Sequence, residues 1–429
     1  MISASSRGRI MNINDFNEGL LGFLDNSPTP FHAVKNITLM LENAGFKRLY
    51  EELKWDLEVG KKYYVTRNDS SVIAFTYPGR KDYTIVGTHS DFPNLKLKPN
   101  PIVKEHGVIK FAVEPYGGLL LTPWFDRDLA LAGRISYLNS QNIIKDVLVK
   151  TSKPIAIIPS LAIHLDDKAN KDKTINKQTD ISPIIQSGDD FELENFLKEL
   201  IKDEGVDDIV ELYANELSLY DIQKASYVGV KKDFIASARL DNLLSCYVGL
   251  LAICSVDETK PFMLVANDHE EVGSESVAGA AGNFFEAVYR RMFENFEDFI
   301  ISTRTSALIS CDNAHAIHPN FPQKHEPNHA PKMNEGVVIK INANQRYASN
   351  SKTISRFLNV ASSLEYKTQK FVTRSDMGCG STIGPITATR LGIDTLDVGL
   401  PTLAMHSIRE LAGVKDAYEL YNILLGYTI

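Results

Sequence analysis

The sequence predicts an α/β fold, in which a mixed, mostly parallel sheet is sandwiched by helices and a β-rich segment is inserted into the chain. Apolar runs suited to strands buried on both faces recur along the sequence, with helical periodicity between them. The apolar runs lie within residues 83–91, 262–268, 307–315 and 394–407. Residues 96–235 differ, because their β-rich stretches are separated by turns marked by Gly and Pro.

We therefore expect two domains. A chain of 429 residues with 44% hydrophobic composition is long enough for more than one core. The change of pattern predicts a discontinuous α/β domain at residues 14–95 and 236–429, interrupted by a second domain at residues 96–235.

The predicted helices have recognisable sequence signals. In the stretch SPTPFHAVKNITLMLENAGF, Thr29 suits the N-cap, Pro30 the first helical position and Gly45 the exit. Further helical patterns are expected at residues 189–205, 240–254 and 351–364, and the polar residues 166–180 are expected to form a surface loop.

Charge and cysteine content narrow the class of protein. The net charge is -8 without a long basic block, so a nucleic-acid partner is not expected. No apolar stretch is long enough to span a bilayer, and the N-terminal residues carry no leader-like apolar run. The four cysteines form no CxxC pair, which favours reduced thiols and a cytoplasmic location.

The apolar runs each lead into polar residues, at the edge where α/β sheets carry their sites. In THSD, His89 can bind a metal and Asp91 can orient its imidazole. In ARLDNLLS, Asp241 either caps the helix that follows or bridges two metal ions. In SCDNAHAIHPN, Asp312 directly follows an apolar run and is the favoured ligand. His315 and His318, in the same stretch, either support the site or are structural.

The stretch DHEEVGS places two carboxylates side by side after a strand. Adjacent side chains point in different directions, so Glu271 can bind a metal while Glu270 stays available as a general base. The alternative is a charged surface turn. In LAMHSIRE, His406 is either a further ligand or a core histidine.

Together these candidates comprise His, Asp and Glu without thiolates, which suits a pair of divalent ions such as zinc, manganese or cobalt. Two such ions about 3.5–4 Å apart can activate a water and polarise a carbonyl. Two other motifs receive more ordinary interpretations. GCGSTIG at residues 378–384 lacks the P-loop pattern and is expected to line a substrate pocket. Asp126, Arg127 and Asp128 are expected to form structural ion pairs.

The collinear motifs resemble the aspartyl aminopeptidase family of dinuclear metallopeptidases, from about residue 15 to the C-terminus. The motifs are SPTPFHAV, GTHSDFP, WFDRDLALAGR, LAIHL, ARLDNLLS, DHEEVGS, CDNAHAIHPNF, NQRYASN, CGSTIGP and LAMHSIRE. The resemblance implies a fold of the zinc-exopeptidase type, a dimerisation domain as the insert, and two zinc ions per subunit. It also implies peptide substrates with a free N-terminus, and a homo-oligomer built from dimers, up to a dodecamer.

The resemblance also implies roles for single residues. One metal would be held by His89 and Asp312, the other by Glu271 and His406, with Asp241 bridging the two. Glu270 would be the general base. His164, in LAIHL, would reach the active site of a neighbouring subunit, although its sequence context alone indicates a structural residue.

Other interpretations remain open at this point. A different dinuclear amidohydrolase, such as a carboxypeptidase or deacylase, would use the same metals, and a non-catalytic assembly protein could keep the fold. Asn344 stands where, by the resemblance, some acidic-specific members of the family carry a lysine. The preference for N-terminal Asp or Glu is therefore open, with Lys340 or Arg346 as substitutes. The physiological metal and the subunit count are open as well.

Overall fold

The computed structural model describes residues 11–427, which fall into two compact units. The first comprises residues 11–91, 225–405 and 410–427, and the second comprises residues 92–224 and 406–409. The sequence expectation about the N-terminal leader falls mainly on residues 1–10, which lie outside the described part of the chain.

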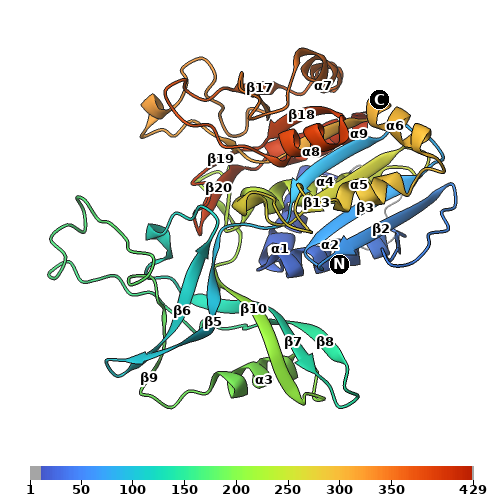
Figure 1. The fold of residues 1–429 in the computed structure, drawn as a ribbon. Helices are drawn as coiled ribbons and strands as arrows, with labels where there is room; N and C mark the ends of the chain where they lie inside the picture. Colours follow the sequence, from blue (N-terminus) through green and yellow to red (C-terminus); the bar gives the residue numbers. More distant parts are fainter. Residues whose placement is uncertain (1–10, 428–429) are drawn as a thin grey trace. The chain divides into compact units, whose positions relative to one another are not determined.

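The first unit is built on a large mixed sheet with the strand order β1-β2-β3-β13-β4-β14-β18-β16-β17 (Figure 1). The central strands β13, β4, β14 and β18 run parallel, which confirms the predicted sheet type. The bounds are β1 Lys47–Arg48, β2 Lys61–Arg67, β3 Ser71–Tyr77, β4 Thr84–His89, β13 Phe262–Asn267, β14 Ala307–Cys311, β16 Val337–Lys340, β17 Thr368–Phe371 and β18 Asp394–Gly399.

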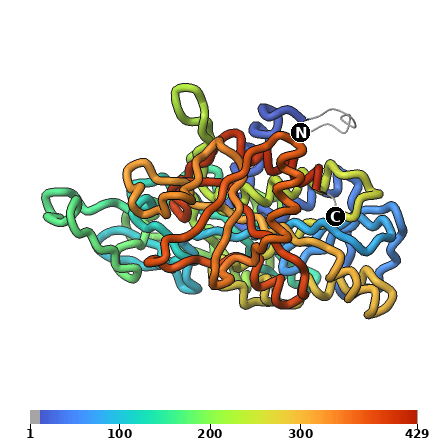
Figure 2. The backbone as a smooth tube through the Cα atoms, turned by 90° about the horizontal axis from the view of Figure 1, so that it is seen from above, coloured from blue at the N-terminus to red at the C-terminus, as the bar shows by residue number. Residues whose placement is uncertain are grey.

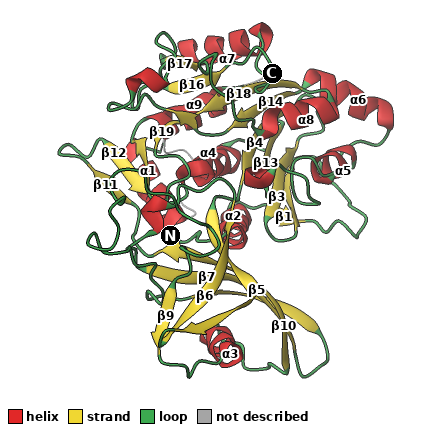
Figure 3. Ribbon diagram, turned by 60° about the vertical axis from the view of Figure 1, so that its left-hand side comes forward, coloured by secondary structure: helices red, strands yellow, loops and turns green. Residues whose placement is uncertain are grey.

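Helices cover both faces of this sheet (Figure 3). On one face, a Cβ at Gly249 of α4 would meet Leu264 and Val86, so this helix lies tightly on β13 and β4. On the other face, Ile383 of α8 lies close to Gly87. The bounds are α1 Ile13–Asp25, α2 Pro30–Asn43, α4 Leu240–Ser255, α5 Phe284–Arg290, α6 Phe296–Thr305, α7 Ser351–Ser363, α8 Ile383–Leu391 and α9 Asp416–Gly426.

The helix signals act as the sequence predicted. The Thr29 hydroxyl accepts the amide hydrogen of His32, Pro30 opens α2, and Gly45 follows the helix with a positive φ of 89°. The patterns at 240–254 and 351–364 form α4 and α7. Because α4 is buried almost all round, it anchors the centre of the unit.

A smaller sheet completes the first unit, with the order β11-β12-β20-β19-β15. The bounds are β11 Ser226–Val228, β12 Phe234–Ser237, β15 Ala314–His315, β19 Pro401–Leu403 and β20 Glu410–Gly413. Short 3-10 helices are η2 Glu270–Val272 and η3 Pro322–Lys324. The connection between β19 and β20 carries residues 406–409, which cluster with the second unit.

The second unit is an antiparallel sheet with the order β8-β7-β10-β5-β6-β9, against which α3 packs. Its bounds are β5 Asn94–Glu105, β6 Val108–Tyr116, η1 Thr122–Trp124, β7 Leu129–Leu138, β8 Ile144–Lys150, β9 Ile184–Ser187, α3 Leu193–Asp203 and β10 Glu211–Asp221. The predicted helix within 189–205 is therefore confirmed, and residues 166–180 form the expected loop without helix or strand.

The WFDRD motif is only partly as predicted. Arg127 forms the expected ion pair, with Asp221 at 3.2 Å. Asp126 instead accepts a hydrogen bond from the backbone amide of Ser160, and the Asp128 side chain forms no ion pair within residues 11–427, so the prediction of ion pairs was wrong for both.

None of the helices between residues 11 and 427 has the length and apolar character that a bilayer crossing requires.

Candidate metal centre

The centre begins at His89, the last residue of β4 and buried at the carboxyl end of the strand. Its Nδ1 donates to the carbonyl oxygen of Asp91 at 3.0 Å, because a carbonyl can only accept. The neutral ring then carries its lone pair on Nε2, which is the form that binds metals.

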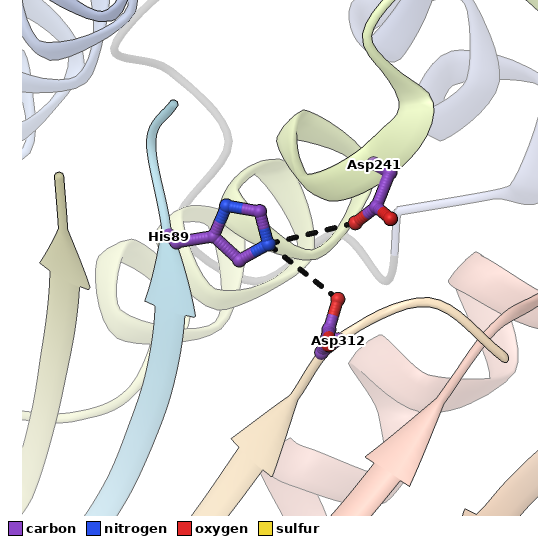
Figure 4. Close-up of side chains that lie close together, drawn as sticks. All are labelled: His89, Asp241 and Asp312. Atoms are coloured by element: carbon purple, nitrogen blue, oxygen red, sulfur yellow. Dashed lines mark ion pairs between the residues drawn. The ribbon is translucent and has the colours of Figure 1, made fainter. Parts of the chain in front are cut away.

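The Nε2 atom of His89 lies 3.5 Å from Oδ1 of Asp241 and 3.5 Å from Oδ1 of Asp312 (Figure 4). Ligand atoms about 2.0–2.1 Å from one zinc ion at tetrahedral angles lie roughly 3.4 Å from each other. The three side chains therefore surround a point that a divalent ion fits.

Asp241 reaches this point from the start of α4. Asp241 and Asn242 have non-helical dihedral angles there, and the Asp241–Asn242 peptide bond is cis. The residue at the N-cap is Arg239, which makes no side-chain capping bond, so Asp241 is not the helix cap. The Asp241 amide donates to Oε2 of Glu410 at 3.0 Å, which fixes the backbone that carries the carboxylate.

The adjacent glutamates follow β13 and form the 3-10 turn η2. The turn is entered through His269 and left through Gly273, both with positive φ, and the His269 ring is held by the Ser276 hydroxyl at 2.8 Å. His89, Glu270 and Glu271 each offer a ligand atom within 4.8 Å of the others. The pair is thus part of the same cluster as His89.

Asp91 joins the histidine to this turn. Its Oδ1 accepts the amide hydrogen of Glu270 at 3.0 Å, and its Oδ2 accepts that of Glu271 at 3.1 Å. The same carboxylate lies 3.3 Å from Nδ1 of His89 and is fully buried. The sequence indicated that Asp91 orients His89, but no sequence signal indicates that it also holds the backbone of both glutamates.

Lys340 is a further member of the centre. Its buried ammonium donates to Oδ2 of Asp312 at 3.2 Å and lies 5.2 Å from the centre of the Tyr347 ring. Burial lowers the pKa of Lys340, but Asp312 and the other acidic groups outweigh burial and hold it above its ordinary value. The charged lysine occupies one oxygen of Asp312, while the other oxygen faces His89.

Electrostatics also favour a cation at this point. Burial lowers the pKa of His89, but the hydrogen-bonded carboxylates around it raise it well above its ordinary value. The raised pKa of His89 means that the surrounding carboxylates stabilise a positive charge at this position. Burial raises the pKa of Glu270 to about 7, with His89 opposing the rise and neighbouring carboxylates adding to it. A base of that strength suits proton transfer near neutral pH.

His406 and His164 belong to segments of the second unit. The His406 Nδ1 donates to the carbonyl oxygen of Gly118 at 3.0 Å, so its neutral ring carries the lone pair on Nε2. His164 is exposed within a turn.

His315 and His318 line a cavity of about 280 Å³ in the first unit. Tyr347 and Phe371 form part of its apolar wall, and Gly378, Cys379 and Gly380 of the glycine-rich stretch line it too. That stretch therefore lines a pocket, as the sequence predicted.

Comparisons with known proteins identify the family of this chain. A family model described as Aminopeptidase I zinc metalloprotease (M18) matches residues 23–427. A probable M18 family aminopeptidase 2 of Ectopseudomonas mendocina (strain ymp) is 49% identical over 419 residues, which cover 96% of this chain and 97% of the relative.

Solved structures give the same result. The chain superposes on the cryo-EM structure of an Ape4 and Nbr1 complex with a TM-score of 0.93 and 36% identity, covering 97% of this chain and 85% of that one. It superposes on the S. cerevisiae mApe1 dodecamer structure with a TM-score of 0.85 and 29% identity, covering 97% of each chain.

The fold and the cluster of histidine and carboxylates define a metal-dependent hydrolase of the α/β class. The chain belongs to the M18 family of zinc aminopeptidases. The expected family, fold class and enzyme class are thereby confirmed, and the protein is a metalloaminopeptidase.

Metal-free Glu270→Gln protein should be more stable than metal-free wild type at pH 8 and about equally stable at pH 4. The folded-state pKa of Glu270 is raised from 4.5 to about 7, so its contribution to stability is complete below pH 4.5 and is lost as the pH rises through 7. Glutamine removes this ionisation and should gain on the order of 2–3 kcal/mol at pH 8. Thermal unfolding of chelator-treated protein at both pH values measures the effect.

Glu275→Gln is the matched control, because Glu275 is exposed on the same loop. It should leave the unfolding midpoint unchanged at both pH values. Equal midpoints for Glu270→Gln and wild type at pH 8 would contradict the electrostatic account.

Proposed function

We propose that this aminopeptidase releases the N-terminal amino acid from peptides with two divalent ions bound in the centre. The observation that carries the proposal is the convergence of His89 with acidic side chains at the carboxyl edge of the main sheet. The family description names zinc, and manganese or cobalt also suits His and carboxylate ligands.

The proposed ligands divide into two sets that share one residue. His89 and Asp312 hold the first ion, Glu271 and His406 hold the second, and Asp241 bridges them. The hydrogen bond from His406 Nδ1 to Gly118 supports its role, because it fixes the tautomer with the lone pair on Nε2. Lys340 supports a single-oxygen ligand at Asp312, because it occupies the other oxygen.

Two ions bound there supply Lewis acidity toward the scissile carbonyl and lower the pKa of a bound water. Glu270 takes the proton from the attacking water and returns it to the amine of the leaving peptide. Its raised pKa supports this role, since a group near neutrality can both accept and return a proton. Asp91 supports the geometry by holding the Glu270 amide and the His89 ring together.

Glu270→Gln should abolish turnover while the protein keeps its metal content. Glu270 is assigned as the base and not as a ligand, so the amide removes proton transfer and leaves the ligand set intact.

Chelation of wild type should also abolish hydrolysis of aminoacyl-anilides, and added zinc, cobalt or manganese should restore it. Activity assays together with elemental analysis of both proteins test the assignment.

Glu271→Gln is the matched comparison, because it changes the neighbouring carboxylate in the same way. It should lower the metal content. If Glu270→Gln loses metal and Glu271→Gln does not, the two roles are reversed. Full activity in metal-free protein would contradict the proposed chemistry.

We also propose that the chain assembles as dimers, up to a dodecamer, and that His164 acts on the active site of a second copy. Leu161, Ile163 and Leu165 flank His164 and are 55%, 59% and 74% exposed. Exposed apolar side chains so close together favour a partner surface. The S. cerevisiae relative of known structure is a dodecamer. As a hydrogen-bond donor to the developing oxyanion, His164 would contribute roughly 10²–10³ in rate.

Mixing His164→Ala with Glu270→Gln should restore activity after dissociation and reassembly. Each variant alone is expected to be nearly inactive. In a mixed dimer, one site has an intact Glu270 and receives an intact His164 from the partner, so about a quarter of wild-type activity should return. Activity assays before and after reassembly measure this recovery. A mixture that stays inactive would assign His164 to its own chain.

The side-chain preference of the enzyme depends on which cations reach the substrate. Lys340 is committed to Asp312. Arg346 donates to the carbonyl oxygen of Cys379, which lines the cavity of about 280 Å³, and the cations that line this cavity themselves are Lys324 and Arg374. We propose a preference that extends beyond N-terminal Asp and Glu, since Asn344 supplies no charge.

We place the enzyme in the cytoplasm. Cys246, Cys254, Cys311 and Cys379 are all unpaired, which supports a reducing compartment.

A further inference from the structure

His164 lies on a long excursion from the sheet of the second unit, residues 159–180, which we call the arm. Ile158 and Ile181, at its two ends, are each 1% exposed and belong to the core of that unit. Between them the chain forms turns without helix or strand. Figure 1 shows this segment as a green loop that extends away from the strands of its own unit, and Figure 2 shows the same loop as a green tube at the left. A side chain on such an arm needs local contacts to be held in place.

Asp126 supplies those contacts at the start of the arm. Its backbone amide donates to the carbonyl oxygen of Ile158 at 2.9 Å, and its Oδ1 accepts the amide hydrogen of Ser160 at 2.8 Å. The Ser160 hydroxyl and amide lower the pKa of Asp126, so the carboxylate stays ionised and the bond is charge-assisted. Ser160 stands four residues before His164, and His164 lies in a turn closed by the hydrogen bond from the Leu165 amide to the Ala162 carbonyl oxygen at 2.8 Å.

The segment that carries Asp126 is anchored to the core of its unit through Trp124. Asp126 follows η1, where Trp124 is buried, and Asp126 itself has a positive φ of 62°, a conformation that Asp tolerates better than most residues. The returning limb of the arm meets the same segment, because the Lys173 ammonium lies 4.7 Å from the centre of the Phe125 ring. Phe125 and Asp126 therefore hold both limbs.

The contacts of Asp126 fit a role in holding the arm better than a role in stabilising the whole unit. Asp126 is exposed, and no Lys or Arg nitrogen within residues 11–427 lies within ion-pair distance of its carboxylate. Its side chain is bonded to the arm and not to the core. Loss of the carboxylate should therefore loosen the arm and leave the fold of the unit intact.

We propose that Asp126 is a positioning residue for catalysis, which sets the conformation of the arm from which His164 reaches the second copy. This inference rests on the proposed action of His164 across the subunit boundary. It assigns Asp126 to the active site of the partner chain and not to that of its own chain.

Asp126→Ala should lower kcat roughly tenfold or more, within the limit of 10²–10³ expected for loss of His164 itself. KM, metal content and the thermal unfolding midpoint should stay close to wild type. Asp126→Asn keeps an oxygen that can accept the Ser160 amide hydrogen, so this variant should retain most of the activity. If only the negative charge of Asp126 mattered, Asp126→Asn would lose as much activity as Asp126→Ala. Asp128→Ala is the matched control, because Asp128 is exposed two residues further along and should leave kcat unchanged.

Reassembly of mixed variants decides in which chain Asp126 acts. Asp126→Ala mixed with Glu270→Gln should regain activity toward about a quarter of wild type, because one site then combines an intact Glu270 with an intact arm from its partner. Asp126→Ala mixed with His164→Ala should gain nothing, since both arms are defective. Recovery in the second mixture would place Asp126 in its own chain's site and overturn the inference.

The inference and the proposed function can fail separately. If His164→Ala and Glu270→Gln complement each other but Asp126→Ala has wild-type kcat, only the role of Asp126 is wrong. If His164→Ala and Glu270→Gln do not complement, the action of His164 across the boundary is wrong. A parallel loss of kcat and of unfolding midpoint in Asp126→Ala would assign it to stability and also overturn the inference.

Discussion

The repulsion among buried carboxylates around His89 is the constraint on which the rest of the centre depends. Asp91, Asp241 and Asp312 all lie within 3.5 Å of the imidazole nitrogens. Removing such charges from water costs several kcal/mol each unless opposite charges are close. Lys340 offsets part of this cost at Asp312, and the raised pKa values of His89 and Glu270 express the remainder. Bound divalent cations remove the conflict, so the fold has a physical reason to hold them.

The main sheet brings these groups together because its central strands are parallel and end at one edge. His89 ends β4, and Asp312 follows β14, its neighbour in the sheet. The glutamates follow β13 on the other side of β4. Asp91 then connects these strands through the glutamate amides, so the proposed base and a proposed ligand are positioned by one buried side chain.

The sequence predicted the sheet and most of the centre because both depend on local patterns. Apolar runs marked the strands, and polar residues such as His89 and Asp312 marked their ends. The bonds of Asp91 to the glutamates were missed, since they join segments far apart in sequence. Lys340 was considered only as a contact for substrate, because nothing local shows that it is buried against Asp312. Asp126 was misassigned to an ion pair, because its partner is a backbone amide.

The central claim is that the cluster exists to hold two ions, and calorimetric titration of chelator-treated protein with zinc tests it most directly. The account predicts two zinc ions bound per chain. It also predicts release of protons on binding, because the metal displaces any proton from the His89 imidazole and its positive charge lowers the raised pKa of Glu270. Asp241→Asn should weaken both binding events, since Asp241 is the proposed bridge. A single ion per chain, or two ions whose binding Asp241→Asn leaves unchanged, would contradict the account.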